Sequence, residues 1–177
     1  LEEVRGRWRE TLWGSFRGRA VATSPLPSSG GQILLTILNI LEATPPLPYR
    51  DPDAIHRYIE ASKRAFADRQ LLGDPAFIAD VTADLTSKAR ARGIFAAIAP
   101  RATPANQIPP AQHSHGPIPR PRSEGVDTTH LCAMDALGNA VSLTTTINYS
   151  WGAGIVAAGT GILWNDQMDD FAVAPGV

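Results

Sequence analysis

The 177-residue sequence contains one cysteine, Cys132, so an internal disulfide is impossible. We expect Cys132 to be a small, buried hydrophobic residue of a strand. No apolar run approaches the roughly 20 residues that a membrane-spanning helix needs. Basic and acidic residues nearly balance, at 16 and 17, so the sequence lacks the basic footprint of a nucleic-acid-binding protein. A small molecule or another protein is the expected partner.

A change of composition divides the chain into two predicted regions. Residues 99–126 contain seven prolines and almost no large apolar residue, so we expect a long exposed loop or linker there. We therefore predict one region over residues 1–127 and another over residues 128–177. His113 and His115 lie in the loop without further metal-ligating residues at metal-site spacing, and we expect no metal site.

Helical patterns precede the loop, after a short strand predicted at residues 18–25. The first helix has Ser28 or Ser29 as its N-cap, and its predicted buried face contains Ile33, Leu34, Ile37, Leu38 and Leu41. The second begins at Pro52 and reaches about Gln70. Its predicted buried stripe contains Ile55, Tyr58, Ile59, Ser62 and Phe66. The third covers residues 84–98, and its predicted inward residues are Leu85, Ala89, Ile94 and Ile98.

Strand patterns follow the loop. The stretches THLCAMD and AVSLTTTIN flank ALGN, which is typical of a turn, and together they predict a β-hairpin. Antiparallel pairing would bring Thr128 and Thr146 side by side, because they lie at similar distances from the turn. A further strand-like piece, GILWN, leads into the polar segment DQMDDF.

A threonine at the boundary between loop and strand has two interpretations. Threonine favours strands, so Thr128 fits an ordinary Thr-rich hairpin. The other interpretation is self-cleavage between Asp127 and Thr128, which would free an α-amino group on the nucleophile's own residue. The reference pKa of that amine, roughly 8, lets it act as a base near neutral pH.

Three segments support the second interpretation by resemblance: TTHLCAMDALGNAVSLTTTIN, WGAGIVAAGTGI and LWNDQMDDFAVAPG. Together they resemble the γ-glutamyltransferase (γ-glutamyltranspeptidase) family of N-terminal-nucleophile hydrolases. The upstream stretches PLPSSGGQILLTILNILE, AIHRYIEASKRAFADR and LLGDPAF are similar to the C-terminal region of the same family's large subunit, in the same order. The resemblance covers nearly the whole chain, and its most specific part is residues 128–176.

The resemblance assigns roles to particular residues. It implies that Thr128 is the catalytic threonine, which autoprocessing makes the first residue of a small subunit, and that Thr146 orients it. The groups that would hold the α-amino end of a γ-glutamyl moiety are Asn148, Gln167 and Asp170. An ammonium prefers a carboxylate and amide oxygens as partners, which agrees with this set. We expect Asp169 to be structural or solvent-facing, and Asp166 to add a negative charge near the pocket.

The family fold is an α+β, four-layer αββα sandwich, which this chain would supply only in part. The implied reaction is transfer or hydrolysis of the γ-glutamyl group of glutathione and γ-glutamyl amides, with water, an amino acid or a peptide as acceptor. No metal or organic cofactor is implied. The cell compartment is not evident from the residues; the resemblance implies a periplasmic or extracellular enzyme.

The chain opens on Leu1 rather than Met, and we expect it to be an internal piece of a longer protein. The resemblance places the arginine that binds the substrate α-carboxylate before Leu1. It places a Ser-Ser pair and the Gly-Gly oxyanion hole after Val177. Because losing one oxyanion donor costs on the order of 100- to 1000-fold in turnover, we expect the isolated piece to be inactive unless the remainder of the enzyme joins it.

Two other interpretations stay open. A cephalosporin or glutaryl acylase of the same superfamily would use the same threonine on a different acyl group. Asp170 speaks against it, because an anionic acyl tail without an ammonium would meet a like charge there. The third interpretation is a degenerate, non-catalytic piece that serves as a structural or interaction element.

Overall fold

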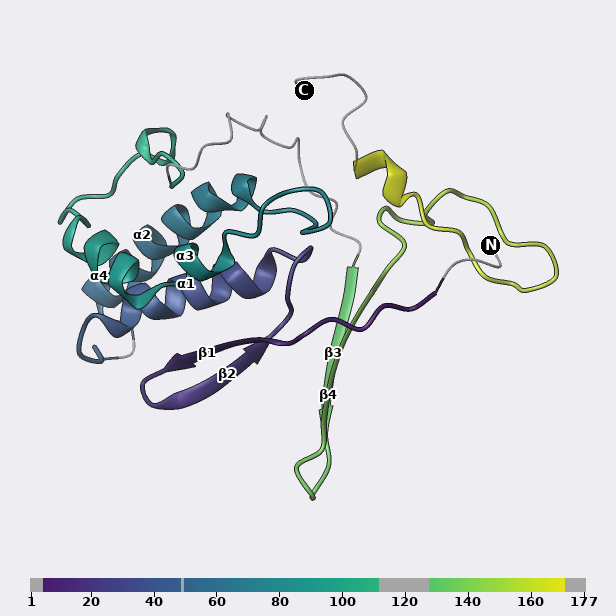
Figure 1. Ribbon diagram of the computed structural model, residues 1–177, viewed down its shortest axis with the longest axis horizontal. Helices are drawn as coiled ribbons and strands as arrows, with labels where there is room; N and C mark the ends of the chain where they lie inside the picture. Colours follow the sequence, from purple (N-terminus) through teal and green to yellow (C-terminus); the bar gives the residue numbers. More distant parts are fainter. Residues whose placement is uncertain (1–4, 49, 112–127, 171–177) are drawn as a thin grey trace. The chain divides into compact units, whose positions relative to one another are not determined.

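The computed structural model describes residues 5–48, 50–111 and 128–170, with only the backbone described at Asp169 and Asp170. The chain divides into two compact units, Leu1–Ile118 and Pro119–Val177. Helices and two antiparallel hairpins make up the described residues, which confirms the α+β class (Figure 1). His113, His115 and Asp127 lie outside the described residues, and the boundary predicted at 127/128 stays a prediction.

An N-terminal hairpin opens the first unit. Strand β1 (Leu12–Phe16) pairs antiparallel with β2 (Arg19–Thr23), so the strand predicted at residues 18–25 is confirmed and its partner is new. Arg17 and Gly18 connect the strands with φ angles of 50° and 78°. Two successive positive φ angles are typical of a type I′ turn, whose twist matches that of the strands.

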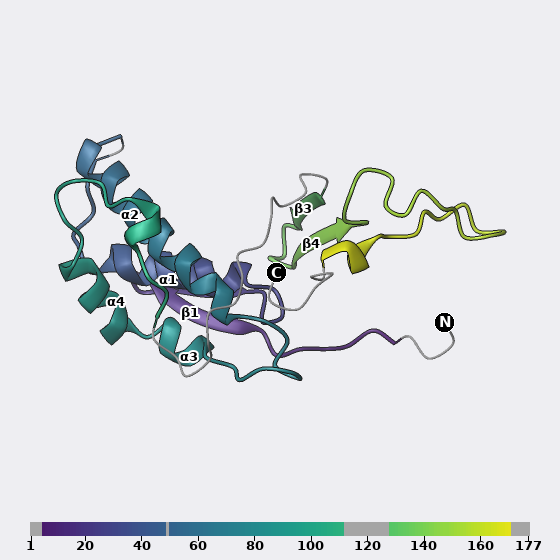
Figure 2. The same cartoon turned by 90° about the horizontal axis from the view of Figure 1, so that it is seen from above.

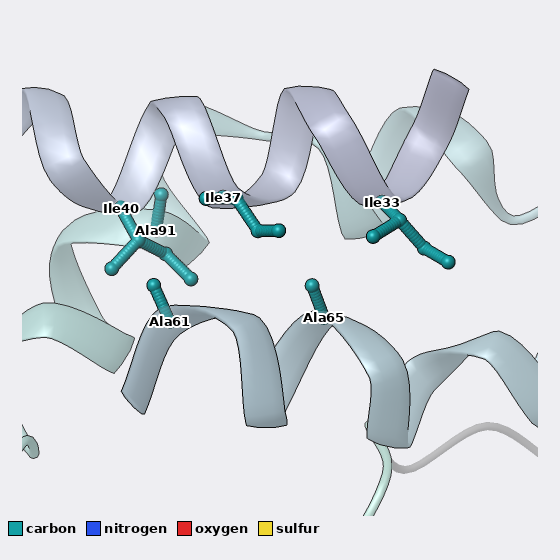
Figure 3. Close-up of a cluster of buried hydrophobic side chains, with 6 residues drawn as sticks. All are labelled: Ile33, Ile37, Ile40, Ala61, Ala65 and Ala91. Carbon is teal, nitrogen blue, oxygen red and sulfur yellow. The ribbon is translucent and has the colours of Figure 1, made fainter. Parts of the chain in front are cut away.

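Helix α1 (Gly30–Glu42) is the centre of this unit. It contacts α2, α3, α4 and β1 (Figure 2). Ile33, Ile37 and Ile40 point toward small side chains on the neighbouring helices, namely Ala61, Ala65 and Ala91 (Figure 3). Alanines allow the helices to approach closely, so the isoleucines fill the space between them.

The predicted buried face of α1 was partly wrong. Leu34 is 41% exposed, whereas Leu35 and Ile40 are almost completely buried. Leu35 lies so close to β1 that a Cβ atom on Gly14 would stand 2.4 Å from its Cδ2. Contacts on several sides therefore bury more of α1 than one stripe. Ser29 occupies the N-cap position, but its hydroxyl accepts a hydrogen bond from Arg69 Nε at 3.1 Å and does not cap the helix.

Helix α2 (Pro52–Asp68) begins as predicted. Asp51 Oδ1 accepts hydrogen bonds from the N–H groups of Asp53 and Ala54, and Pro52 is the first helical residue. The predicted buried stripe was wrong. Its large members are 44–55% exposed: Ile55, Tyr58, Ile59 and Phe66. The opposite face is buried, and it carries Glu60, Ala61, Ala65 and Asp68.

The third predicted helix is two helices. Helix α3 (Thr82–Leu85) ends at Thr86, and α4 (Lys88–Ala96) begins after Ser87, whose hydroxyl accepts a hydrogen bond from Arg90 N. Leu85 is buried as predicted, but Ala91 rather than Ala89 is the buried residue of α4. Short 3₁₀ turns complete the unit at Arg69–Leu71 and Ala105–Gln107.

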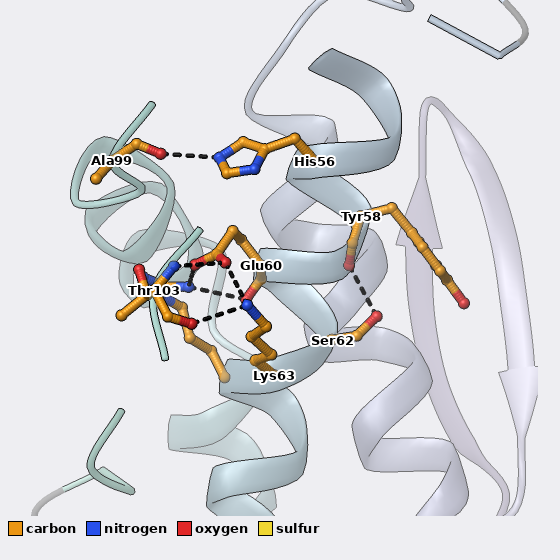
Figure 4. Close-up of polar contacts among 8 residues, drawn as sticks. His56, Tyr58, Glu60, Ser62, Lys63, Ala99 and Thr103 are labelled. Carbon is orange, nitrogen blue, oxygen red and sulfur yellow. Dashed lines mark hydrogen bonds and ion pairs between the residues drawn. The ribbon is translucent and has the colours of Figure 1, made fainter. Parts of the chain in front are cut away.

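Two fully buried carboxylates stabilise the inner face of α2. Glu60 pairs with Lys63 and Arg64, each at 2.7 Å, and accepts the backbone N–H of Thr103 (Figure 4). Burial opposes ionisation of Glu60, but the two cations and the N–H outweigh it and lower its pKa to about 2. Asp68 similarly binds Arg90 at 2.7 Å and the backbone N–H of Ala111 at 2.8 Å.

The second unit contains the predicted hairpin, β3 (Thr128–Met134) paired with β4 (Ala140–Thr146). Asp135 organises its turn by accepting bonds from the side-chain amide and backbone N–H of Asn139, and these bonds lower the Asp135 pKa. Every residue of both strands is exposed, including Cys132, so the expected burial was wrong for the described chain. The GILWN piece forms only an isolated bridge, Val156 with Leu163.

We predict that Glu60 makes the helical unit sensitive to acid. Because its pKa is lowered on folding from the ordinary 4.5 to about 2, the stabilisation is present above pH 4.5 and is lost as the pH falls toward 2. The free energy of unfolding should fall by roughly 3 kcal/mol over this range through Glu60. Urea unfolding followed by circular dichroism at 222 nm would measure it. The Glu60→Gln variant should be less stable than the wild type at pH 7, and its free energy of unfolding should fall less in acid. If the wild type and the variant show the same pH dependence, Glu60 is not the source of the acid sensitivity.

Two glycines offer a matched test of the packing around α1. A Cβ atom on Gly31 would lie 2.1 Å from the backbone oxygen of Ser24, whereas one on Gly93 in α4 would meet nothing within 4 Å. Gly31→Ala should cost about 1–3 kcal/mol through overpacking. Gly93→Ala should stabilise the chain by about 0.5–1 kcal/mol, because alanine is the better helix former. Urea midpoints that move in the same direction for both variants would contradict this placement of α1.

Candidate active site

The open end of the β3–β4 hairpin brings two threonine hydroxyls together. Thr128 pairs with Thr146 in the strand register, and the Thr128 hydroxyl donates a hydrogen bond to Thr146 Oγ1 at 3.2 Å. Thr128 and Thr146 therefore lie side by side, as predicted. A hydroxyl held in this way has a fixed direction for attack, although its reactivity also requires a base.

Thr146 also connects the hairpin to the segment that follows it. The backbone N–H of Asn148 donates to Thr146 Oγ1 at 2.9 Å, so one hydroxyl oxygen accepts bonds from both Thr128 and Asn148. Asn148 has a φ of 75°, a conformation that asparagine tolerates better than most residues. Its side-chain amide donates to the backbone oxygen of Asp166 at 3.4 Å.

Asp166 binds the backbone of the residues that follow β4. Its carboxylate accepts the backbone N–H of Tyr149 at 3.1 Å, and its own N–H donates to the oxygen of Ile147 at 3.2 Å. We expected Asp166 to add negative charge near the pocket; the structure shows that its carboxylate also binds the backbone N–H of Tyr149, a residue of the hollow's lining. Sequence reasoning missed the contact between Asp166 and Tyr149. The only signal for it in the sequence is that Asp166 directly follows a predicted strand.

The two threonines lie in an open hollow of about 630 Å³. Four threonines form one part of its lining: Thr128, Thr129, Thr145 and Thr146. Ile147, Tyr149, Ser150 and Trp151 form the rest. Its lining therefore combines hydroxyl-bearing residues with two aromatic residues.

The other predicted substrate-binding residues lie nearby in the chain but not in this lining. Gln167 begins a 3₁₀ turn (Gln167–Asp170), and its backbone N–H donates to Asn165 Oδ1 at 3.0 Å. The lining includes neither Asn148 nor Gln167. The side chains of Asp169 and Asp170 are outside the described part of the chain. The roles predicted for Asn148, Gln167 and Asp170 therefore stay predictions.

A polar ladder continues along the same hairpin face. His130 Nδ1 lies 2.7 Å from Thr144 Oγ1, and His130 Nε2 lies 3.3 Å from Cys132 Sγ and 3.2 Å from Ser142 Oγ. These residues recur at every second position of the strands, which is the signal that could have identified them. The ladder stiffens the hairpin beyond its Thr128–Thr146 end.

The described residues contain no group of three or more His, Cys, Asp or Glu side chains that could hold a metal ion. The helices of the described residues likewise lack the length and apolar character that crossing a membrane requires.

Comparisons with known proteins show what the chain as a whole is similar to. The sequence model of the family described as Gamma-glutamyltranspeptidase matches residues 1–177. A glutathione hydrolase proenzyme of Pseudomonas sp. (strain A14) is 43% identical over 181 residues, which cover 100% of this chain and 30% of that protein. The chain thus spans about a third of the length of this curated relative.

Solved structures show the same relationship. The gamma-glutamyltranspeptidase of Helicobacter pylori matches with a TM-score of 0.59 and 36% identity, over 62% of this chain and 33% of the other. The cephalosporin acylase of Bacillus halodurans matches with a TM-score of 0.77 and 25% identity, over 98% of this chain and 29% of the other. These likenesses confirm the predicted N-terminal-nucleophile hydrolase fold class. Since the family model matches it from end to end, the chain belongs to the gamma-glutamyltranspeptidase family.

Proposed function

We propose that this chain carries the nucleophile of an enzyme that transfers or hydrolyses γ-glutamyl groups, with glutathione and γ-glutamyl amides as acyl donors. The observation that supports the proposal best is the 3.2 Å hydrogen bond between the Thr128 and Thr146 hydroxyls inside an open hollow. The resemblance assigns further groups of the site to segments outside these 177 residues. The proposed activity is therefore that of the complete protein.

The first proposed step is self-cleavage between Asp127 and Thr128. The Thr128 hydroxyl attacks the carbonyl carbon of Asp127, the C–N bond breaks, and an ester forms while the α-amino group of Thr128 takes up a proton. Water then hydrolyses the ester, which leaves Thr128 as a new N-terminus. The name proenzyme on the Pseudomonas relative supports a maturation step of this kind.

After cleavage, the free α-amino group is the base that the hydroxyl lacks. It accepts the Thr128 proton as the oxygen attacks the γ-carbonyl, and returns the proton to the departing amine. The γ-glutamyl ester that remains on Thr128 is then resolved by water, an amino acid or a peptide amine. The 3.2 Å contact with Thr146 holds the Thr128 oxygen in place, and at the moment of attack the hydroxyl proton passes to the α-amino group instead of to Thr146.

The acyl group brings its own ammonium, which needs oxygen partners. Asn148, Gln167 and Asp170 are the residues proposed to bind it. Asn148 lies two residues after Thr146, and its backbone N–H donates a hydrogen bond to Thr146 Oγ1, so the backbone that carries this amide is coupled to the neighbour of the proposed nucleophile. A carboxylate at Asp170 would provide the charge that favours an ammonium over an uncharged tail.

A second candidate is an acylase that uses the same threonine on an acyl group without an ammonium. The fold match to the Bacillus halodurans cephalosporin acylase, over 98% of this chain, favours it. The higher identity of 43% to the glutathione hydrolase proenzyme favours γ-glutamyl transfer. A non-catalytic role is the remaining alternative, and complete absence of acyl transfer in the full-length protein would support it.

We predict that Thr146 orients Thr128 during both maturation and turnover. In the full-length protein, Thr128→Ala should abolish self-cleavage, and Thr146→Ala should slow cleavage and lower kcat at least about tenfold with little change in KM. Gel electrophoresis and steady-state kinetics would measure these effects. Thr144→Ala is the matched control, because Thr144 lies on the same face but contacts His130. A Thr146→Ala enzyme that matures normally and only shows a raised KM would contradict the role.

We predict that Asp170 determines the choice of acyl donor. Asp170→Asn keeps the shape and removes the charge, so kcat/KM for γ-glutamyl-p-nitroanilide should fall at least about tenfold, as expected for a lost charge-assisted bond of roughly 1.5–3 kcal/mol. Hydrolysis of glutaryl-p-nitroanilide, which has no ammonium, should fall much less or rise. If both substrates fall by the same factor, Asp170 supports the fold instead. A wild-type preference for the glutaryl compound would favour the acylase.

A further inference from the structure

Trp151 has a backbone conformation that its side chain disfavours. Its φ is 67°, in the left-handed region where a bulky residue is an outlier. Its side chain is 75% exposed, so burial of the indole among the described residues does little to offset the cost. Residues in such conformations persist where the surrounding structure fixes them, and they cluster at ligand-binding positions.

Backbone contacts on both sides fix Trp151 in this conformation. Gly152 N donates to Tyr149 O at 2.8 Å, and Gly154 N donates to Trp151 O at 2.9 Å, so two turns overlap at Trp151. Gly152 also lies against the 163–165 segment, because a Cβ atom there would stand 2.1 Å from Trp164 O. Asp166 holds the start of the first turn through the N–H of Tyr149. The backbone that carries the exposed indole, residues 149–154, is therefore held in a fixed conformation.

Trp151 is one of the residues that line the hollow containing Thr128. Trp151 and Tyr149 are part of its lining, together with the four threonines, and the lining contains no charged side chain among the described residues. Tyr149 is 39% exposed. Two exposed aromatic residues thus line the same hollow as the candidate nucleophile.

We propose that Trp151 is a specificity-determining residue that binds the amine side of the scissile amide and selects donors and acceptors with a planar or aromatic group there. This inference rests on the proposed γ-glutamyl transfer. The acyl side carries an ammonium and a carboxylate, which require charged or strongly polar partners. The amine side has no such requirement, and an aromatic face contributes most to a planar apolar group through stacking and desolvation. An exposed indole on a fixed backbone supplies that face with little ordering on binding.

The test compares two γ-glutamyl donors in the full-length enzyme, the p-nitroanilide and the methylamide, together with glutaryl-p-nitroanilide. Trp151→Ala removes the ring, and Trp151→Gly removes it while allowing the positive φ without steric cost. Trp151→Phe keeps an aromatic face. Trp164→Ala is the matched control, since Trp164 is 48% exposed, contacts Gly152 and Ala153 through its backbone, and does not line the hollow.

For γ-glutamyl-p-nitroanilide, Trp151→Ala and Trp151→Gly should lower kcat/KM about tenfold, mainly through KM, while the methylamide changes by less than about twofold. Trp151→Phe should retain at least about a third of the wild-type value, and Trp164→Ala should match the wild type. Equal losses for both γ-glutamyl donors, or none for either, would overturn the inference alone. A loss seen with the γ-glutamyl but not the glutaryl anilide would overturn it in favour of an indole that binds the ammonium. A wild-type enzyme without any γ-glutamyl transfer would overturn the proposed function, and this inference with it.

Discussion

The antiparallel register of β3 and β4 is the constraint on which the candidate site depends. It places Thr128 opposite Thr146, and a shift by one residue would turn one of the two hydroxyls to the other face of the hairpin. Asp135 and Asn139 fix the turn at the far end. Between the turn and the Thr128–Thr146 pair, the strands are also joined by side-chain contacts among His130, Thr144, Cys132 and Ser142. The position of the candidate nucleophile, Thr128, thus depends on hydrogen bonds distributed along the whole hairpin.

The position of the loop after β4 also depends on the pairing of β3 with β4. The Thr146 oxygen binds both the Thr128 hydroxyl and the Asn148 N–H, and Asp166 holds Tyr149 in place. Thr128, the candidate nucleophile, and the backbone of Asn148, a proposed substrate ligand, are therefore parts of one hydrogen-bonded arrangement. Such preorganisation reduces the reorganisation that binding and attack require.

Local patterns in the sequence predicted elements better than burial. The hairpin, the start of α2 at Pro52 and the contact between Thr128 and Thr146 followed from turn chemistry, capping and strand pairing. The buried face of α2 did not, because hydrophobicity alone assigns Glu60 to the surface. Its two cations and the Thr103 N–H allow it inside, and these partners are set by tertiary contacts that no helical period reveals. The role of Asp166 was hidden for the same reason, since its partners are backbone groups 17 to 19 residues earlier.

Full exposure of the β3–β4 hairpin has a consequence for how this piece behaves in solution. In the described chain the sheet has two strands, so each presents an outer row of backbone N–H and C=O groups. The strand AVSLTTT is rich in residues that favour strands and contains neither charge nor proline. Such an edge is a template for another strand, and copies of the isolated chain will pair edge to edge as their concentration rises.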